Sequence, residues 1–161
     1  RLETYPVPDS HPFLFMHRIV LDYPDREAER ALLAAPDRRE LISKLQPCLT
    51  TAQIDRIRAA VANVLASSAL IDYVQSLLAA SRTHADIRVG LSPRAGLALL
   101  SAARACSLLG GRSYGLPEDV QTVLIGTAAN RLSLVGNRKL TSAQLASALM
   151  AQTPVRYKSY Q

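Results

Sequence analysis

The sequence predicts an all-α protein, a helical bundle preceded by a short extended segment. Apolar residues make up 48% of the 161 residues, yet aromatic residues make up only 5% and tryptophan is absent. The core must therefore be built from Ala, Leu, Ile and Val, a composition typical of packed helices rather than of a β-sandwich. Apolar residues also recur at helical intervals in several segments that open with good capping residues.

The first 23 residues are expected to be extended. Pro6, Pro8 and Pro12 interrupt regular structure, and the β-branched residues that follow favour a short strand at 18–22. Because one strand cannot bury its own surface, we expect its sheet to lie upstream. Residues 1–23 would then be the C-terminal remnant of an α/β core, in a chain that belongs to a longer protein.

Helices are expected over most of the remaining chain. The segments with helical spacing of apolar residues and local start or stop signals are 25–35, 51–65, 68–82, 93–109 and 117–130. Thr50 with Gln53, and Thr141 with Gln144, have the spacing of a capping box, and the second pair begins a shorter helix that ends near residue 151. We expect a connecting loop at 83–91. The apolar side chains expected to face the core include Ile54, Ile57, Ile71, Leu77, Leu97, Leu99, Val120 and Leu124.

The segment 93–109 has both of its ends defined by the sequence. Ser92 suits the N-cap, and Pro93 suits the first helical position because its missing N–H would be unpaired there anyway. Gly110 and Gly111 can supply the left-handed turn that ends a helix. This segment is therefore the best-defined helix of the chain.

Arg94 is the unusual residue of this helix. The positive end of a helix dipole normally favours acidic side chains, whereas Arg94 places a cation in the first turn. Together with the free N–H groups of that turn it forms a place where an anion binds favourably, and Arg88 lies just upstream and can add to it. The alternative is that Arg94 is an ordinary solvated arginine at a helix start.

Three short motifs follow one another in an order that identifies a family. They are Gly-Leu-Ser-Pro-Arg-Ala at 90–95, Gly-Gly-Arg-Ser-Tyr at 110–114 and Pro-Glu-Asp-Val at 117–120. Their combination resembles the lid domain of the MoxR-type AAA+ ATPases, and the resemblance extends more loosely from about residue 5 to residue 134. In that family the arginine of the Ser-Pro-Arg motif, here Arg94, is the sensor-2 arginine, which contacts the γ-phosphate of ATP held by a separate nucleotide-binding domain.

The resemblance also implies cofactors and partners. The full-length parent would bind ATP and Mg²⁺ through an upstream nucleotide-binding domain, form a homo-oligomeric ring and hydrolyse ATP. MoxR-like ATPases have chaperone-like roles in assembling or activating protein complexes, so protein clients are expected. The bend at Tyr23 and Pro24 is the expected hinge. In AAA+ proteins generally the base of ATP packs near such a junction, so both residues are expected to bind nucleotide.

The sequence departs from the family at two positions. The family usually has Gln-Leu-Asp-Arg-Phe where this chain has residues 11–15, so the arginine often assigned as the finger to a neighbouring subunit's nucleotide falls on Leu14. A leucine cannot stabilise phosphoryl charge, which argues against hydrolysis in trans. Leu116 stands where the family usually has Thr, and the missing N-cap hydroxyl costs about 1 kcal/mol.

Several kinds of site are not expected in this chain. The sequence has no GxxxxGK[ST] loop to cradle phosphates and no apolar run ending in acidic residues to hold Mg²⁺, so the chain should not hydrolyse ATP or hold a cofactor by itself. Cys48 and Cys106 lack metal-ligand spacing, which predicts no metal site and fits a reduced, cytoplasmic setting. No apolar run approaches the roughly 20 residues of a membrane span.

The charge of the chain leaves other classes of function open. The formal net charge is +6, but the basic residues are scattered rather than gathered into a stripe with interleaved aromatic residues, so no nucleic-acid partner is expected. A helical protein-interaction scaffold without nucleotide chemistry would also explain the apolar stripes, and a basic DNA-binding bundle would explain the charge. The expected division is a core remnant and hinge at 1–23, the helical lid domain at 24–152 and a flexible tail at 153–161.

Overall fold

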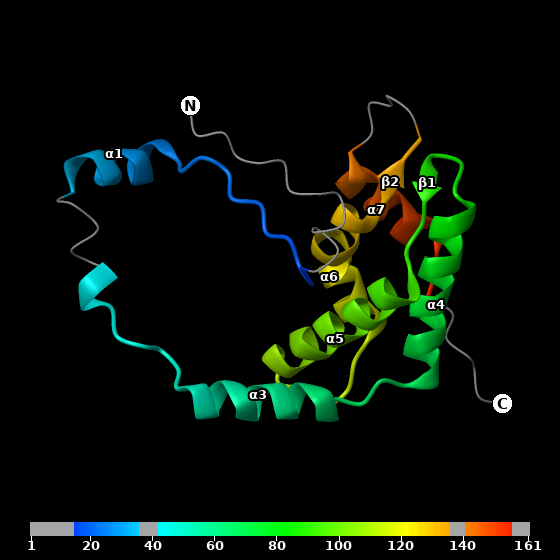
Figure 1. The fold of residues 1–161 in the computed structure, drawn as a ribbon, viewed down its shortest axis with the longest axis horizontal. Coiled ribbons are helices and arrows are strands. Elements are labelled where there is room, and N and C mark those ends of the chain that lie inside the picture. The colour runs from blue at the N-terminus through cyan, green and yellow to red at the C-terminus, as the bar shows by residue number, and fades with distance from the viewer. Residues whose placement is uncertain (1–14, 36–41, 136–140, 156–161) are drawn as a thin grey trace. The chain divides into compact units, whose positions relative to one another are not determined.

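The computed structural model describes residues 15–35, 42–135 and 141–155 (Figure 1). The chain divides into two compact units, and within the described residues one is Ile19–Arg58 while the other comprises 15–18 and 59–155. No helix in these described ranges is both long and apolar enough to cross a membrane.

The helical bundle lies in the second unit and confirms the all-α fold class. Its elements are helix α4 (Ser68–Thr83), α5 (Pro93–Leu109), α6 (Pro117–Ala128), the short 3-10 helix η2 (Ala129–Arg131) and α7 (Ser142–Gln152). α5 and α6 pack most extensively against each other, and α4 and α7 complete the bundle (Figure 1). The fully buried side chains are aliphatic for the most part, as the composition predicts, and include Leu70, Leu77, Leu91, Leu99, Val120, Leu124, Leu145 and Leu149.

The buried side of α5 differs from the one expected. Ala95, Leu99, Ala103 and Ser107 recur every four residues and are buried, whereas Leu97 is 68% exposed. The prediction that Leu97 faces the core is therefore wrong. An Ala/Leu-rich helix is apolar on more than one side, so hydrophobicity alone does not choose the side that packs; here the small residues allow α6 to approach closely.

A short antiparallel pair of strands joins the bundle, β1 (Ile87–Val89) and β2 (Ser133–Leu134). Ile87 lies opposite Leu134 and Val89 opposite Ser133, with an irregularity between the two pairs. The prediction of a loop throughout 83–91 is therefore wrong at Thr83, which ends α4, and at Ile87–Val89. Strands this short carry almost no local signal, because their hydrogen bonds come from a segment that two helices separate in sequence.

The other unit contains α1 (Arg26–Ala34), a helical turn at 42–44 and the start of α3 (Thr51–Asn63). The Asp25 carboxylate caps α1 by accepting a hydrogen bond of 2.8 Å from the Ala28 N–H. No residue of α1 is buried.

α3 begins with the predicted capping box. The Gln53 N–H donates to the Thr50 hydroxyl at 3.3 Å, and the Thr50 N–H donates to the Gln53 side-chain oxygen at 2.7 Å. Its apolar stripe is not buried, since Ile54 and Ile57 are 39% and 45% exposed. The period of a helix tells which residues share a side, but it does not tell what covers that side.

The strand predicted at 18–22 does not form. Residues 15–25 contain no helix or strand, because a strand requires a neighbour to supply its hydrogen bonds and none of the described segments lies along this stretch as a strand. Residues 15–18 instead contact the end of α6. The Arg18 N–H donates to the Gly126 carbonyl at 2.7 Å, and His17 Nδ1 lies 3.1 Å from Thr127 Oγ1.

Candidate functional site

The N-terminus of α5 is built as its sequence predicts. Ser92 has extended backbone angles and is the N-cap, and its hydroxyl accepts a hydrogen bond of 3.3 Å from the Ala95 N–H. Pro93 occupies the first helical position. The side chain of Arg94 therefore leaves the chain from the first turn of α5, at the positive end of the helix dipole.

The connection that leads into α5 is held tightly against the end of α4. The Leu91 N–H donates to the buried Ser81 hydroxyl at 2.8 Å, and the Leu91 carbonyl accepts from Arg82 Nε at 3.0 Å. A side chain at Gly90 would lie 2.7 Å from the Ser81 carbonyl oxygen, so only glycine fits at this close approach. These contacts fix the position of the Ser92 cap and hence of Arg94.

A cavity of about 270 Å³ lies beside this helix start. Its lining residues are Val89, Gly90, Ser92, Arg94 and Arg131, which come from β1, the α5 cap and the end of η2. No carboxylate is among these lining residues. Both charged groups at the cavity are cationic, so it is suited to a negatively charged group.

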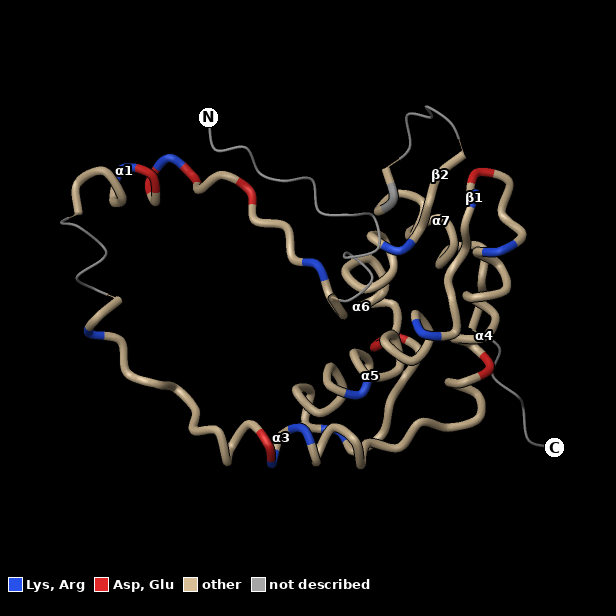
Figure 2. The backbone as a smooth tube through the Cα atoms, in the orientation of Figure 1, with Lys and Arg blue, Asp and Glu red and all other residues tan. Residues whose placement is uncertain are grey.

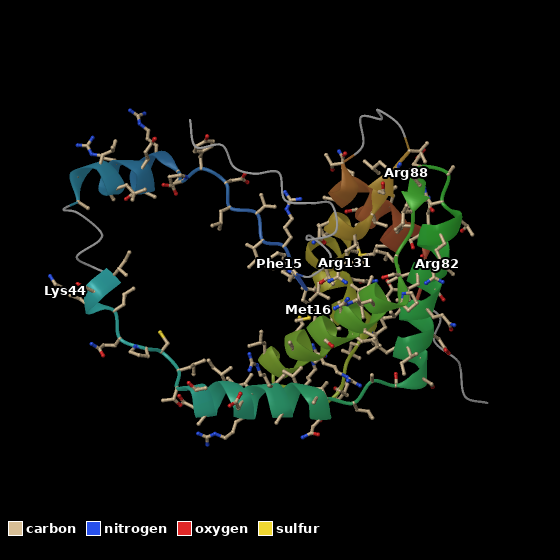
Figure 3. The ribbon with its side chains drawn as sticks, viewed as in Figure 1. Phe15, Met16, Lys44, Arg82, Arg88 and Arg131 are labelled. Atoms are coloured by element: carbon tan, nitrogen blue, oxygen red, sulfur yellow. The ribbon has the colours of Figure 1, made fainter. Side chains whose placement is uncertain are left out.

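Arg131 is the member of this cavity that the sequence does not reveal. It is only 7% exposed, and one terminal nitrogen donates to the Phe15 carbonyl at 2.8 Å (Figure 3). Its Nε is buried without a hydrogen-bond partner in the described part of the chain. The pKa of Arg131 is lowered, first by burial and then by the charge of Arg94, although a guanidinium remains protonated at neutral pH.

Arg88 is not brought to the cavity. It lies on β1, where its Nε and Nη2 donate to the Ser133 hydroxyl of β2 at 3.3 and 3.0 Å (Figure 3). Arg88 is exposed. In this structure it joins the two short strands, and its expected role in anion binding stays a prediction.

Tyr23 and Pro24 belong to the Ile19–Arg58 unit. Tyr23 is 99% exposed, and both residues line a shallow hollow together with Leu21 and Asp22. They directly precede the Asp25 cap of α1, as expected for a junction before the first helix. Their role at the base of ATP also stays a prediction.

The opposite end of α5 is joined to α6 by a buried carboxylate. Asp119 is 3% exposed and accepts hydrogen bonds from both Arg112 terminal nitrogens at 2.6 and 2.8 Å, from the Leu116 N–H at 2.8 Å and from the Ser107 hydroxyl at 2.7 Å. The Arg112 guanidinium, helped by these other donors, holds the pKa of Asp119 well below its usual range despite burial. Gly111 has a φ of 72°, so the turn before Arg112 is the left-handed one predicted.

Charged residues of both signs are interspersed over the part of the chain that the structure describes (Figure 2). Basic positions are spread along the described chain, with acidic positions between them (Figure 2). Within the described residues, no group of three or more His, Cys, Asp or Glu side chains is placed to hold a metal ion.

Comparison with known proteins agrees with this architecture. The family model described as the AAA lid domain matches residues 79–151, which include β1, α5, α6 and the cavity. The chain is 30% identical to the chaperone MoxR1 of Mycobacterium tuberculosis over 145 residues, covering 81% of this chain and 37% of that protein. It is 34% identical to the protein MoxR of Paracoccus denitrificans over 153 residues, covering 83% of this chain and 45% of that protein.

A further relative and a solved structure are also similar to this chain over most of its length. The uncharacterized protein YeaC of Bacillus subtilis is 28% identical over 141 residues, which cover 88% of this chain and 44% of that protein. The crystal structure of a putative ATPase from Cytophaga hutchinsonii superposes with a TM-score of 0.80 at 24% identity, over 95% of this chain and 50% of that one, and thus supports the fold. The chain spans half or less of the length of each of these proteins. The lid-domain match and the MoxR relatives show that this chain is a MoxR-type AAA+ lid fragment, and the shared fold agrees with this assignment.

Proposed function

We propose that this lid domain contributes Arg94 as the sensor-2 arginine to ATP held by a nucleotide-binding domain of the same protein. The observation that carries the proposal is the position of Arg94 at the start of α5, on a cavity lined by a second arginine and by no carboxylate. A guanidinium there is permanently charged and lies next to the N–H groups of a helix N-terminus, both of which favour a phosphate.

The proposed role of Arg94 follows from the charge that develops on ATP during hydrolysis. Phosphoryl transfer places negative charge on the γ-phosphate oxygens, and a fixed cation stabilises the transition state when it is held near those oxygens. The contacts of Gly90 and Leu91 with α4 hold the Arg94 backbone in place before any nucleotide binds. Arg94 then needs only the approach of lid and nucleotide to act, so its effect should depend on the third phosphate.

The proposal for the whole protein is broader. ATP and Mg²⁺ would be bound by an upstream nucleotide-binding domain, and the active form would be a homo-oligomeric ring that acts on protein clients in a chaperone-like way. The name of the M. tuberculosis relative, a chaperone, supports this role. A cytoplasmic setting is part of the same proposal and is supported by the free thiols of Cys48 and Cys106.

The test is steady-state ATP hydrolysis by the full-length protein. Arg94→Ala should lower turnover roughly a hundredfold or more, because loss of one such charge contact costs about 2–4 kcal/mol in the transition state. Arg94→Lys should recover only part of the rate, since Lys keeps the charge but lacks the planar fork of donors. Arg56→Ala is the matched control, because Arg56 is an exposed arginine on α3 that is not among the residues lining the cavity.

Thermal melts on all variants separate catalysis from folding. Arg94 is exposed, so its loss should leave the melting temperature unchanged. Equal turnover of wild type and Arg94→Ala at equal stability would show that Arg94 is a surface arginine and would remove the sensor role.

A protein-interaction scaffold without nucleotide chemistry is the second candidate. It is favoured by the large apolar side chains that α5 leaves in solvent, Leu97 at 68% and Leu109 at 90% exposure. Nucleotide binding separates the two candidates, because a scaffold has no reason to prefer ATP over ADP in the full-length protein.

A further inference from the structure

Arg131 is a buried cation without a negatively charged partner among the described residues. Arg131 as a whole residue is 7% exposed, and cations in protein interiors are normally paired because burying an isolated charge is costly. Only the Phe15 carbonyl and no carboxylate is bonded to it among the described residues, and its Nε has no partner. Arg131 therefore carries a positive charge that no described carboxylate compensates.

The second cation makes this arrangement less favourable still. Arg94 lines the same cavity, and neither arginine forms an ion pair in the described part of the chain. Two like charges at one cavity repel each other, and the N-terminus of α5, which also lines the cavity, adds a partial positive charge. An anion in the cavity would be attracted by both arginines and by the helix N-terminus, and would offset the repulsion among these three positive charges.

We propose that Arg131 and Arg94 together form an oxyanion site within the lid, which takes a phosphoryl group. Arg131 supplies the buried cation, Arg94 supplies the exposed one, and the N-terminus of α5 adds its partial positive charge. This deepens the proposed function, because in the full-length protein the phosphoryl group would be the γ-phosphate of ATP. Free inorganic phosphate is the other source of the same chemistry.

The site also has a structural link to the segment before the hinge. Arg131, which lines the cavity, donates from Nη2 to the Phe15 carbonyl, while His17 and Arg18 contact Thr127 and Gly126 at the end of α6. A ligand bound at Arg131 would therefore contact the same residue that holds residues 15–18 against the bundle. For this reason Arg131 is expected to act from a fixed position, whereas exposed Arg94 is free to adjust.

The test is a titration of the 161-residue chain with inorganic phosphate, tripolyphosphate and adenosine, followed by NMR of the arginine Nε–H groups. Both phosphate probes should shift the Arg131 and Arg94 signals together in a saturable, salt-sensitive way, and adenosine should shift neither. Binding at least about tenfold tighter for tripolyphosphate would identify a nucleotide tail as the source, and equal binding would identify free phosphate. Absence of a saturable Arg131 shift with either probe overturns the site.

Variants then separate this site from the sensor role. Arg131→Lys keeps a cation but loses the planar fork of guanidinium donors, and phosphate affinity should fall about tenfold, as expected for loss of one hydrogen bond to a charged group. Arg94→Ala should have a similar effect, and Arg56→Ala none. If Arg131→Lys does not fold, the wild-type titration still decides the outcome.

The failures of the two proposals look different. A shift of Arg94 alone, with the Arg131 signal unmoved, would overturn the two-arginine site and leave the sensor role standing. Coupled shifts in the chain, combined with normal ATP turnover by Arg94→Ala in the full-length protein, would support the oxyanion site and overturn the sensor role.

Discussion

Replacing Asp119 with alanine should destabilise the lid more than most single substitutions. Asp119 is the third residue of α6, is 3% exposed, and accepts four hydrogen bonds from three residues. Its partners belong to the last turn of α5, the turn that follows it and the start of α6. The substitution would therefore act on the packing of α5 against α6, which positions the arginine cavity.

The magnitude can be worked from these contacts. Breaking a buried ion pair by removing one partner costs about 3–5 kcal/mol, and the lower end applies because the Arg112 side chain is 28% exposed and can reach water. Loss of the carboxylate that receives the Leu116 N–H removes a helix cap worth about 1 kcal/mol. The sum predicts a loss of about 4 kcal/mol in the free energy of unfolding.

Urea denaturation of the 161-residue chain, followed by circular dichroism, measures this loss. Asp55→Ala is the control, because it breaks the exposed pair between Asp55 and Arg58 at 3.4 Å and should cost no more than about 0.5 kcal/mol. Asp119→Asn keeps the shape and one acceptor and should lie between wild type and Asp119→Ala. A cost below about 1 kcal/mol for Asp119→Ala would refute the view that this carboxylate joins α5 to α6.

Three further predictions concern stability. The folded-state pKa of Asp119 is depressed, so its stabilising contribution is complete above the unfolded-state pKa of about 3.9 and is lost as the pH falls toward the folded-state pKa. The difference in free energy of unfolding between wild type and Asp119→Ala, measured by urea titration, should therefore become smaller below about pH 4. A difference that stays constant with pH would contradict the assignment. Gly90→Ala places a Cβ 2.7 Å from the Ser81 carbonyl oxygen and should cost about 1–3 kcal/mol in the same assay, whereas a neutral result would mean that the connection into α5 is not tightly held. Leu116→Thr supplies the missing N-cap hydroxyl and should raise the stability of α6 by about 0.5–1 kcal/mol, and a lower melting temperature would show that the contacts of Leu116 outweigh the cap.

The features that the sequence could predict depend on residues close to one another in the chain. The caps at Thr50, Ser92 and Thr141 depend on groups within three residues of one another, and all three form as expected. The same holds for Gly111, whose positive φ ends α5 through contacts within one turn. Arg94 could be singled out for this reason, since its unusual place at a helix start is itself a local feature.

Tertiary contacts explain what the sequence could not predict. Arg131 lies 37 positions after Arg94 in the sequence, and only the packing of α5 against α6 brings both to one cavity. An arginine at the end of a helix has no signal that separates it from an ordinary surface residue. The β1–β2 pairing and the choice of buried side in α5 escaped for the same reason, because each depends on a distant partner.

The central claim is that Arg94 recognises the third phosphate of ATP. The most direct measurement is the affinity of the full-length protein for ATP and for ADP, by calorimetry, with and without Arg94→Ala. This measurement does not require the parent to hydrolyse ATP, which Leu14 in place of the family's arginine brings into question. Wild type should bind ATP more tightly than ADP, and Arg94→Ala should lose that preference with little change in ADP affinity. An unchanged ratio of ATP to ADP affinity in a folded Arg94→Ala variant would contradict the account.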